Sequence, residues 1–292
     1  MRYKNGAAFR RALEDRLRTM SLETGEPLVR LRKMVAFDRF LSRLFLHGPD
    51  QWVVKGGFAL QLRLGASART TKDIDLLVMG EVHEIYPHLR ESGATDLGDW
   101  FAFEVMDTTP SDIDDIGGLR YRLHSLLDGR TFERFHVDVG IGDPLLAPVE
   151  YLETPALLAF AGIEPTIVPC FPITQQIAEK YHAFTRPHVS GVSSRVKDFV
   201  DMLLLAEMGE LENVSLRQAI RVTFDDRKTH ELPVRVPLPS KDWSRPFLKL
   251  ANEVGLEFES LPDAGEALQQ FLEPALVAEA HLRWNPTNWQ WE

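Results

Sequence analysis

The chain has 292 residues, of which 44% are hydrophobic, 26% charged and 10% aromatic, a composition typical of a globular protein with one large domain or two ordinary ones. A formal net charge of −10 argues against a nucleic-acid coat protein, and a single cysteine excludes an internal disulfide. The sequence has no run of roughly 18 apolar residues and no apolar signal core at its start, so we expect a cytoplasmic protein without a membrane span.

Apolar side chains recur at helical spacing in residues 6–20 and 27–46, which predicts an N-terminal helical segment, 1–48, packed on the core. Residues 1–46 hold 11 Lys and Arg against five Asp and Glu. The excess allows two interpretations: a basic helical face that contacts RNA phosphates, or helices with ordinary solvated charges. The basic side chains concerned are those of Arg10, Arg11, Arg16, Arg18, Arg30, Arg32, Lys33, Arg39 and Arg43.

The remaining chain divides by pattern into two regions. In residues 49–171, short apolar runs alternate with Gly, Pro and Asp, which predicts a core with a mixed sheet and flanking helices, and residues 172–292 predict a C-terminal helical domain. The fold class is therefore α/β (α+β). The expected strands are 52–55, 73–78, 100–106, 119–126 and 134–141. The expected helices are 58–64, 174–185, 194–208, 216–223, 243–254 and 264–282. We expect the indoles of the tail, Trp284, Trp289 and Trp291, to pack onto the body of the protein or onto a neighbouring chain rather than to bind a base.

Two acidic residues, Asp73 and Asp75, interrupt a run that otherwise has the pattern of a buried strand. Residues two apart on a strand point to the same face, so the two carboxylates converge on one small volume. Because adjacent negative charges repel, a cation is expected between them. A divalent metal such as Mg²⁺, which prefers oxygen ligands, fits this requirement.

A possible phosphate site precedes these acids. Lys55 ends a short predicted strand, and Gly56 and Gly57 form a turn from which a helix begins at once. Glycines let backbone N–H groups approach a ligand closely, and a helix N-terminus favours phosphate. Arg69 adds a second cation just before the acidic strand. The combination of metal ligands, backbone donors and cations is a working set for nucleotidyl transfer.

The order KGG, apolar helix, RTTKDID resembles the signature of DNA polymerase β-type nucleotidyltransferases. It resembles more narrowly the AbiEii/AbiGii toxin family, which includes the mycobacterial MenT toxins. A third family motif, K-x-x-A, is matched by residues 180–183, and a fourth, R-x-K-D-x-x-D, by residues 195–201. The four motifs together span residues 55–201 and imply a nucleotidyltransferase-fold sheet.

The resemblance implies roles for individual residues. Asp73 and Asp75 would bind metal and act in catalysis with Lys180 and Asp198, where Asp198 would be a base or would orient Lys180. The triphosphate would be held by Lys55, Gly56, Gly57, Arg69, Lys180 and Arg195.

Helical spacing also bears on the downstream motifs. It turns Lys180 and Asp198 toward buried helix faces, where a charge is costly unless it is paired or bound to a ligand. A structural ion pair between helices is therefore the alternative to a catalytic role. The same spacing points Lys197 and Asp201 more outward.

A third metal ligand is expected in polymerase β-type sites, on a neighbouring strand. In TFERFHVDVGIGD, alternation places Arg134, His136 and Asp138 on one face, which makes Asp138 the candidate. The alternative is that Asp138 is a solvent-facing residue on the polar side of an edge strand.

The resemblance implies a toxin that uses an NTP and Mg²⁺ to add nucleotides to RNA, in particular to the tRNA 3′ acceptor end, which would block translation. A cognate antitoxin protein would hold it in check. An alternative enzyme is a nucleotidyltransferase that modifies a small molecule or a protein, such as an antibiotic-modifying or AMP-transferring enzyme. A binding module with an inactive site is the alternative outside catalysis.

Overall fold

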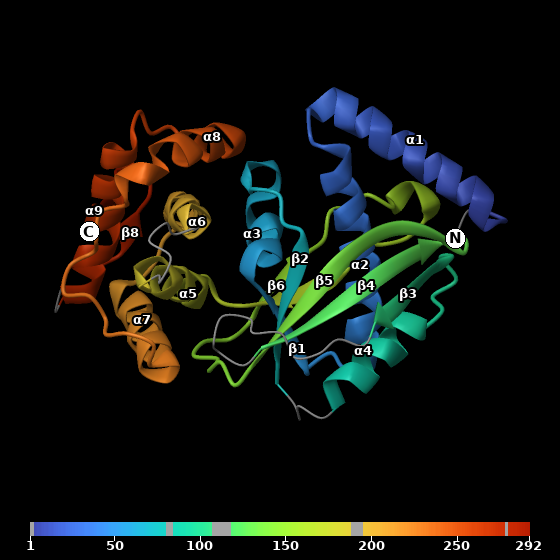
Figure 1. Cartoon of the computed structure of the whole chain (residues 1–292), viewed down its shortest axis with the longest axis horizontal. Coiled ribbons are helices and arrows are strands. Elements are labelled where there is room, and N and C mark those ends of the chain that lie inside the picture. Colours follow the sequence, from blue (N-terminus) through green and yellow to red (C-terminus); the bar gives the residue numbers. More distant parts are fainter. Residues whose placement is uncertain (1–2, 80–83, 107–117, 188–194, 278–279) are drawn as a thin grey trace. The chain divides into compact units, whose positions relative to one another are not determined.

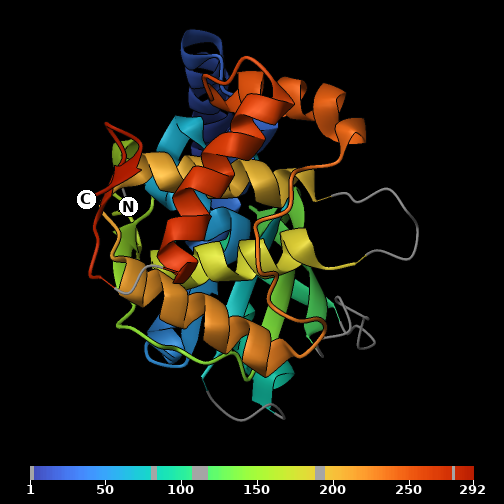
Figure 2. The same ribbon diagram turned by 90° about the vertical axis from the view of Figure 1, so that its left-hand side faces the viewer.

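The computed structural model describes residues 3–79, 84–106, 118–187, 195–277 and 280–292. The chain forms two compact units (Figures 1 and 2). Unit 1 consists of Met1–Arg63, Thr70–Gly142 and Val149–Cys170. Unit 2 consists of Leu64–Arg69, Asp143–Pro148 and Phe171–Glu292.

Unit 1 is built on a mixed sheet that has seven strands within the described residues, in the order β3-β4-β5-β2-β1-β7-β6. β2 runs parallel to β5 and antiparallel to β1, so the centre of the sheet combines both orientations. The strands are β1 (Trp52–Lys55), β2 (Asp73–Val78), β3 (Phe101–Met106), β4 (Leu119–Leu127), β5 (Arg130–Ile141), β6 (Glu150–Glu153) and β7 (Ile167–Cys170).

The helices of unit 1 are α1 (Gly6–Thr24), α2 (Leu28–His47), α3 (Gly56–Leu64) and α4 (Ile85–Ala94). α2 supplies much of the core because its apolar stripe packs on the sheet. Phe37 makes edge-to-face contacts with Phe58 of α3 and Phe135 of β5, both at 5.0 Å between ring centroids. Phe40 packs in the same way on Phe103 of β3. These aromatic contacts fix α2 against the sheet.

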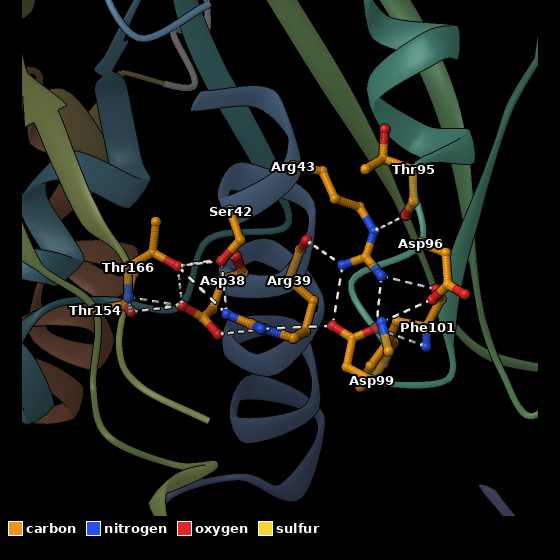
Figure 3. A network of polar contacts seen from close by, with 11 residues as sticks. Asp38, Arg39, Ser42, Arg43, Thr95, Asp96, Asp99, Phe101, Thr154 and Thr166 are labelled. Carbon is orange, nitrogen blue, oxygen red and sulfur yellow. Dashed lines mark hydrogen bonds and ion pairs between the residues drawn. The ribbon is translucent and has the colours of Figure 1, made fainter. Parts of the chain in front are cut away.

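α2 also carries a buried network of charged side chains (Figure 3). Arg43 is fully buried and donates hydrogen bonds to both carboxylate oxygens of Asp99, at 3.1 and 2.6 Å. Arg39 lies 2.8 Å from Asp38, whose Oδ1 accepts a hydrogen bond from the Thr154 hydroxyl at 2.6 Å. Each charge is therefore balanced within unit 1, as burial requires.

The interpretation of the N-terminal cations as a phosphate-binding face is wrong for most of them. Arg30, Arg39 and Arg43 are buried. Arg10 donates to the backbone oxygens of residues 127, 130 and 131, and Arg32 pairs with Glu14. The alternative, ordinary solvated charges, is wrong for the same residues. Their guanidinium groups satisfy backbone carbonyls and buried carboxylates and so hold the two N-terminal helices on the sheet.

Unit 2 is helical, with α5 (Ile173–Thr185), α6 (Val196–Met208), α7 (Asn213–Arg227), α8 (Ser244–Val254) and α9 (Leu261–Val277), and with a short ribbon of β8 (Trp284–Asn285) and β9 (Gln290–Trp291). The tail indoles pack as expected. Trp284 is buried and donates to the Ala206 oxygen, Trp289 donates to the Ala267 oxygen, and Trp291 to the Phe271 oxygen.

The predicted mixed α/β fold is confirmed. The differences concern the ends of elements and three short elements that the sequence pattern did not reveal. β5 begins at Arg130 rather than at residue 134, because Asp128 and Gly129, at φ +53° and +69°, form a tight hairpin turn after β4. The prediction missed α4, β6 and β7. Ser194, the first residue of the predicted helix 194–208, lies outside the described residues, as do residues 278 and 279 of the predicted helix 264–282.

Candidate active site

The strand, glycine turn and helix predicted from Lys55 onward are present in unit 1. β1 ends at Lys55 and α3 begins at Gly56 without an intervening loop. Gly56 has φ +61°, a left-handed conformation that favours glycine. Gly57 lies next to it at the N-terminus of α3, where backbone N–H groups have no partner within the helix. The geometry therefore presents backbone donors at this edge of the sheet.

Asp75 lies directly on the glycine turn. It is the register partner of Lys55 across the β1–β2 pair, and its Oδ2 accepts a hydrogen bond of 3.3 Å from the backbone N–H of Gly57. A Cβ added at Gly56 would lie 2.0 Å from the same oxygen. The bare backbone of Gly56 is thus what allows a carboxylate and the helix N-terminus to share this place.

The three predicted metal carboxylates come from two adjacent strands of unit 1. Asp73 and Asp75 lie on β2, and Asp75 is the register partner of Asp138 on β5. His136, also on β5, is the partner of Asp73, and its Nδ1 lies 3.1 Å from Asp73 Oδ1. β2 and β5 therefore place acidic side chains in two neighbouring register positions.

Asp138 is held by an arginine that the sequence analysis did not single out. Arg120 of β4 donates from Nε and Nη2 to the two oxygens of Asp138, at 2.7 and 2.6 Å. These hydrogen bonds raise the pKa of the Arg120 guanidinium above its ordinary value. Desolvation opposes this effect, and the charges of Asp138, Asp73 and Asp75 add to it. Arg120 thus lies in the field of all three carboxylates.

Asp73 and Asp75 fit a magnesium ion. Mg²⁺ is commonly bound by one or two carboxylates, with water and substrate phosphates completing its six oxygen ligands. A group of three or more His, Cys, Asp or Glu side chains that could hold a metal is absent from the described residues. Asp138 satisfies Arg120 in this arrangement, so its role as a third ligand stays a prediction.

The predicted residues of the downstream motifs meet within unit 2. Lys180 on α5 donates to Asp198 Oδ1 at 2.9 Å, and its Nζ lies 2.8 Å from Asp201 Oδ2; both acids are on α6. Arg69 binds Asp201 through two hydrogen bonds of 2.8 Å. Arg195 lies 3.5 Å from Asp198. Two helices and the segment before β2 are thereby joined by alternating charges.

The charges of this cluster are stabilised by one another. Burial lowers the pKa of Lys180, but Asp198 and Asp201 outweigh that effect and raise its pKa above the ordinary value. Burial raises the pKa of Asp201, and Lys180 followed by Arg69 outweighs it and lowers the pKa. Lys180 therefore stays protonated and Asp201 ionised at neutral pH. Such a lysine can neutralise phosphate charge but cannot serve as a base.

One prediction about the fourth motif is wrong. Asp201 was expected to point outward, yet it is fully buried and shared by Lys180 and Arg69, whereas Lys197 is exposed as expected. The spacing of α6 in fact supports the buried position, because Asp201 lies three residues after Asp198 and four before Leu205, on the same side of the helix. Arg120 was missed because its partner lies on another strand.

A groove of about 690 Å³ in unit 2 is lined by Arg221, Phe224, Asp225, Lys228, His230, Glu231 and Leu232. The charges of Asp225 and Glu231 balance those of Arg221 and Lys228. Burial, with a smaller effect of Arg186, lowers the pKa of His230, so this ring adds no charge at neutral pH. The groove therefore lacks the net positive charge that favours a polyanion such as RNA.

Comparison with known proteins shows the family of the chain. Residues 39–275 match the sequence model of the family described as nucleotidyl transferase AbiEii toxin, type IV TA system. The chain belongs to this family of nucleotidyltransferase toxins, and this confirms the resemblance drawn from its four motifs. No curated protein matches the sequence significantly.

Two solved structures are similar to this chain to different degrees. MenT4, a nucleotidyltransferase toxin from Mycobacterium tuberculosis H37Rv, superposes with a TM-score of 0.58 and 20% identity, covering 90% of this chain and 97% of that one. JHP933 from Helicobacter pylori gives a TM-score of 0.47 at 16% identity, covering 84% of this chain and 93% of its own. The similarity to MenT4 shows a common nucleotidyltransferase fold.

No helix in the described part of the chain combines the length and apolar character needed to cross a bilayer.

Proposed function

We propose that the protein is a Mg²⁺-dependent toxin that transfers a nucleoside monophosphate from an NTP to RNA, at the 3′ acceptor end of tRNA, and so blocks translation. The observation that carries this proposal is the position of Asp75 on the Gly56–Gly57 turn, with Asp73 on the same strand. A carboxylate beside the N-terminus of a helix is suited to a metal-bound triphosphate.

The residues of unit 1 would hold the metal and the phosphates. Asp73 and Asp75 would bind Mg²⁺, which would supply charge neutralisation at the phosphates and lower the pKa of the attacking hydroxyl. When Asp75 binds the metal, the Gly57 N–H that now donates to it would be able to donate to a phosphate oxygen, and Lys55 would add a positive charge at the end of β1. In this role the turn favours a bound anion over water.

The residues of unit 2 would act as fixed cations. The raised pKa of Lys180 supports a role in balancing phosphate charge. Its hydrogen bond to Asp198 supports the orienting role for that acid among the two considered. Arg69 would contribute a guanidinium whose direction is set by two hydrogen bonds to Asp201. Arg195, paired with Asp198, completes the proposed nucleotide-binding set.

In the proposed reaction, the 3′-hydroxyl oxygen of the RNA bonds to the α-phosphorus of the NTP. The bond from that phosphorus to the oxygen bridging to the β-phosphate breaks, pyrophosphate leaves, and the hydroxyl proton passes to solvent or a base. Family membership supports a nucleotidyltransferase toxin, and tRNA as the acceptor is part of the proposal. We further propose that the protein works in the cytoplasm, where NTPs and tRNA occur, and that a cognate antitoxin protein restrains it.

Incubation with each α-labelled NTP, Mg²⁺ and total RNA tests this function. We expect label on tRNA, one or more added nucleotides when the 3′ ends are sequenced, and loss of transfer in Asp75→Asn but not in Asp50→Asn, an exposed acid of the same unit. Label that appears on small molecules or proteins and not on RNA would support the alternative enzyme. Toxicity that survives Asp75→Asn without any transfer would support a binding module.

A further inference from the structure

The pair formed by Arg120 and Asp138 has a geometry that the proposed reaction does not explain. The guanidinium occupies both oxygens of Asp138 through hydrogen bonds of 2.7 and 2.6 Å. Arg120 and Asp138 are register partners on β4 and β5, and Asp138 is in turn the partner of Asp75 on β2. Three neighbouring strands thus place cation, carboxylate and carboxylate in one row across the sheet.

Charge balance suggests what the arginine does in this row. Asp73, Asp75 and Asp138 bring three negative charges to two adjacent strands, and these charges repel one another unless cations lie among them. The charges of all three act on Arg120. Its guanidinium therefore compensates part of the charge that would otherwise be available to a divalent cation.

Exposure distinguishes this pair from the buried charge networks of α2 and of unit 2. The Arg120 side chain is 42% exposed, whereas that of Asp138 is 11% exposed. A guanidinium with this much access to water can leave its partner without being desolvated, so the pair is exchangeable. By contrast, Arg43 is fully buried and has no such freedom.

We propose that Arg120 is a built-in counter-cation that holds Asp138 out of the metal site and thereby weakens binding of a divalent cation at Asp73 and Asp75. This inference rests on the proposed function of those two residues. Arg120 is a positioning residue here, since it acts through Asp138. The resting protein then has a two-carboxylate site that binds a free divalent cation weakly and depends on substrate phosphates for the remaining ligands.

Titration of the full chain with Mn²⁺ in the absence of nucleotide tests the proposal, by calorimetry and by the shift in thermal midpoint. We expect Arg120→Gln to bind Mn²⁺ about tenfold more tightly than the unaltered protein, because a repelling charge is removed and a third carboxylate is released. Arg120→Lys, which keeps the charge without the two-pronged hydrogen bond, should lie between them. Arg122→Gln is the matched control, since Arg122 lies two residues along β4 with His136 as its register partner.

A double variant separates release of Asp138 from a general change of charge. Arg120→Gln combined with Asp138→Asn should return the Mn²⁺ affinity to near that of the unaltered protein. Unchanged affinity in Arg120→Gln, or a gain fully retained in the double variant, would overturn the proposal while leaving the proposed function intact. If neither the unaltered protein nor Arg120→Gln shows Mn²⁺ binding that depends on Asp75, as tested with Asp75→Asn, this proposal and the proposed function would both be overturned.

Discussion

The carboxylate of Asp75 occupies the space that a side chain at Gly56 would need. A Cβ built on Gly56 lies 2.0 Å from Asp75 Oδ2 and 2.5 Å from its carboxyl carbon. The same glycine has φ +61°, and the next residue donates its N–H to that oxygen. The glycine turn and the Asp75 carboxylate therefore depend on each other, because a side chain at Gly56 would take the space of the carboxylate.

Gly56→Ala should abolish nucleotide transfer. The methyl group would displace the Asp75 carboxylate, and the left-handed backbone would add strain of about 1 kcal/mol. Gly25→Ala is the matched control, because Gly25 has φ +76° but open space around the added methyl group. We expect both variants to lose stability from backbone strain, Gly56→Ala more than Gly25→Ala because of its contact with Asp75, and a fall in transfer of about 100-fold or more in Gly56→Ala alone. Equal activity of the two variants would contradict the role of the turn.

Asp201→Asn should destabilise unit 2 by about 3 kcal/mol, since breaking a buried pair leaves charges without compensation. Asp201 is fully buried and serves both Lys180 and Arg69. Urea unfolding measures the change. Lys197→Gln, an exposed position in the same motif, should alter the free energy of unfolding by no more than about 0.5 kcal/mol. A stable Asp201→Asn protein would remove the structural role.

The lowered pKa of His182 should make the folded protein less stable in mild acid. Burial, followed by the charges of Arg227 and His230, lowers the pKa of His182 to about 3 from its ordinary 6.5. Below pH 6.5 the unfolded chain binds a proton that the folded protein does not, so stability falls as the pH falls toward 3, by at most about 1.4 kcal/mol per pH unit.

Urea unfolding between pH 7 and 4.5 would measure this slope. His182→Gln should flatten it, and His281→Gln, at an exposed position, should leave it unchanged. Equal slopes in the unaltered protein and in His182→Gln would assign the acid sensitivity to other groups.

Arg43 tests whether the N-terminal arginines are structural. Arg43→Met leaves Asp99 buried without its principal cation, which should lower the free energy of unfolding by about 3 kcal/mol or more. The RNA affinity of the folded variant, measured well below its thermal midpoint, should not change. Arg11→Met, at an exposed position of α1, is the control for loss of charge. Reduced RNA affinity with unaltered stability in Arg43→Met would restore the phosphate-binding interpretation.

Local features were predictable wherever a short stretch of sequence contains both the signal and its cause. β1 and β2 have the predicted bounds, because apolar runs with glycine or polar flanks define them. The strand-turn-helix junction at Gly56 follows from the conformational freedom of glycine. α4, β6 and β7 were missed, since short elements depend on packing and pairing partners remote in sequence.

The sequence by itself determined the family and the motif residues, through the order of its four motifs. It also determined the mixed fold, because apolar residues recur with different spacing in strands and in helices. Only the tertiary structure decided how their charges are paired. Arg120 meets Asp138 across a sheet, Asp201 turns inward to Lys180 and Arg69, and Arg43 is buried with Asp99. Each pairing joins different elements of the fold, and the cost of burying an unpaired charge makes the partner a property of the folded arrangement.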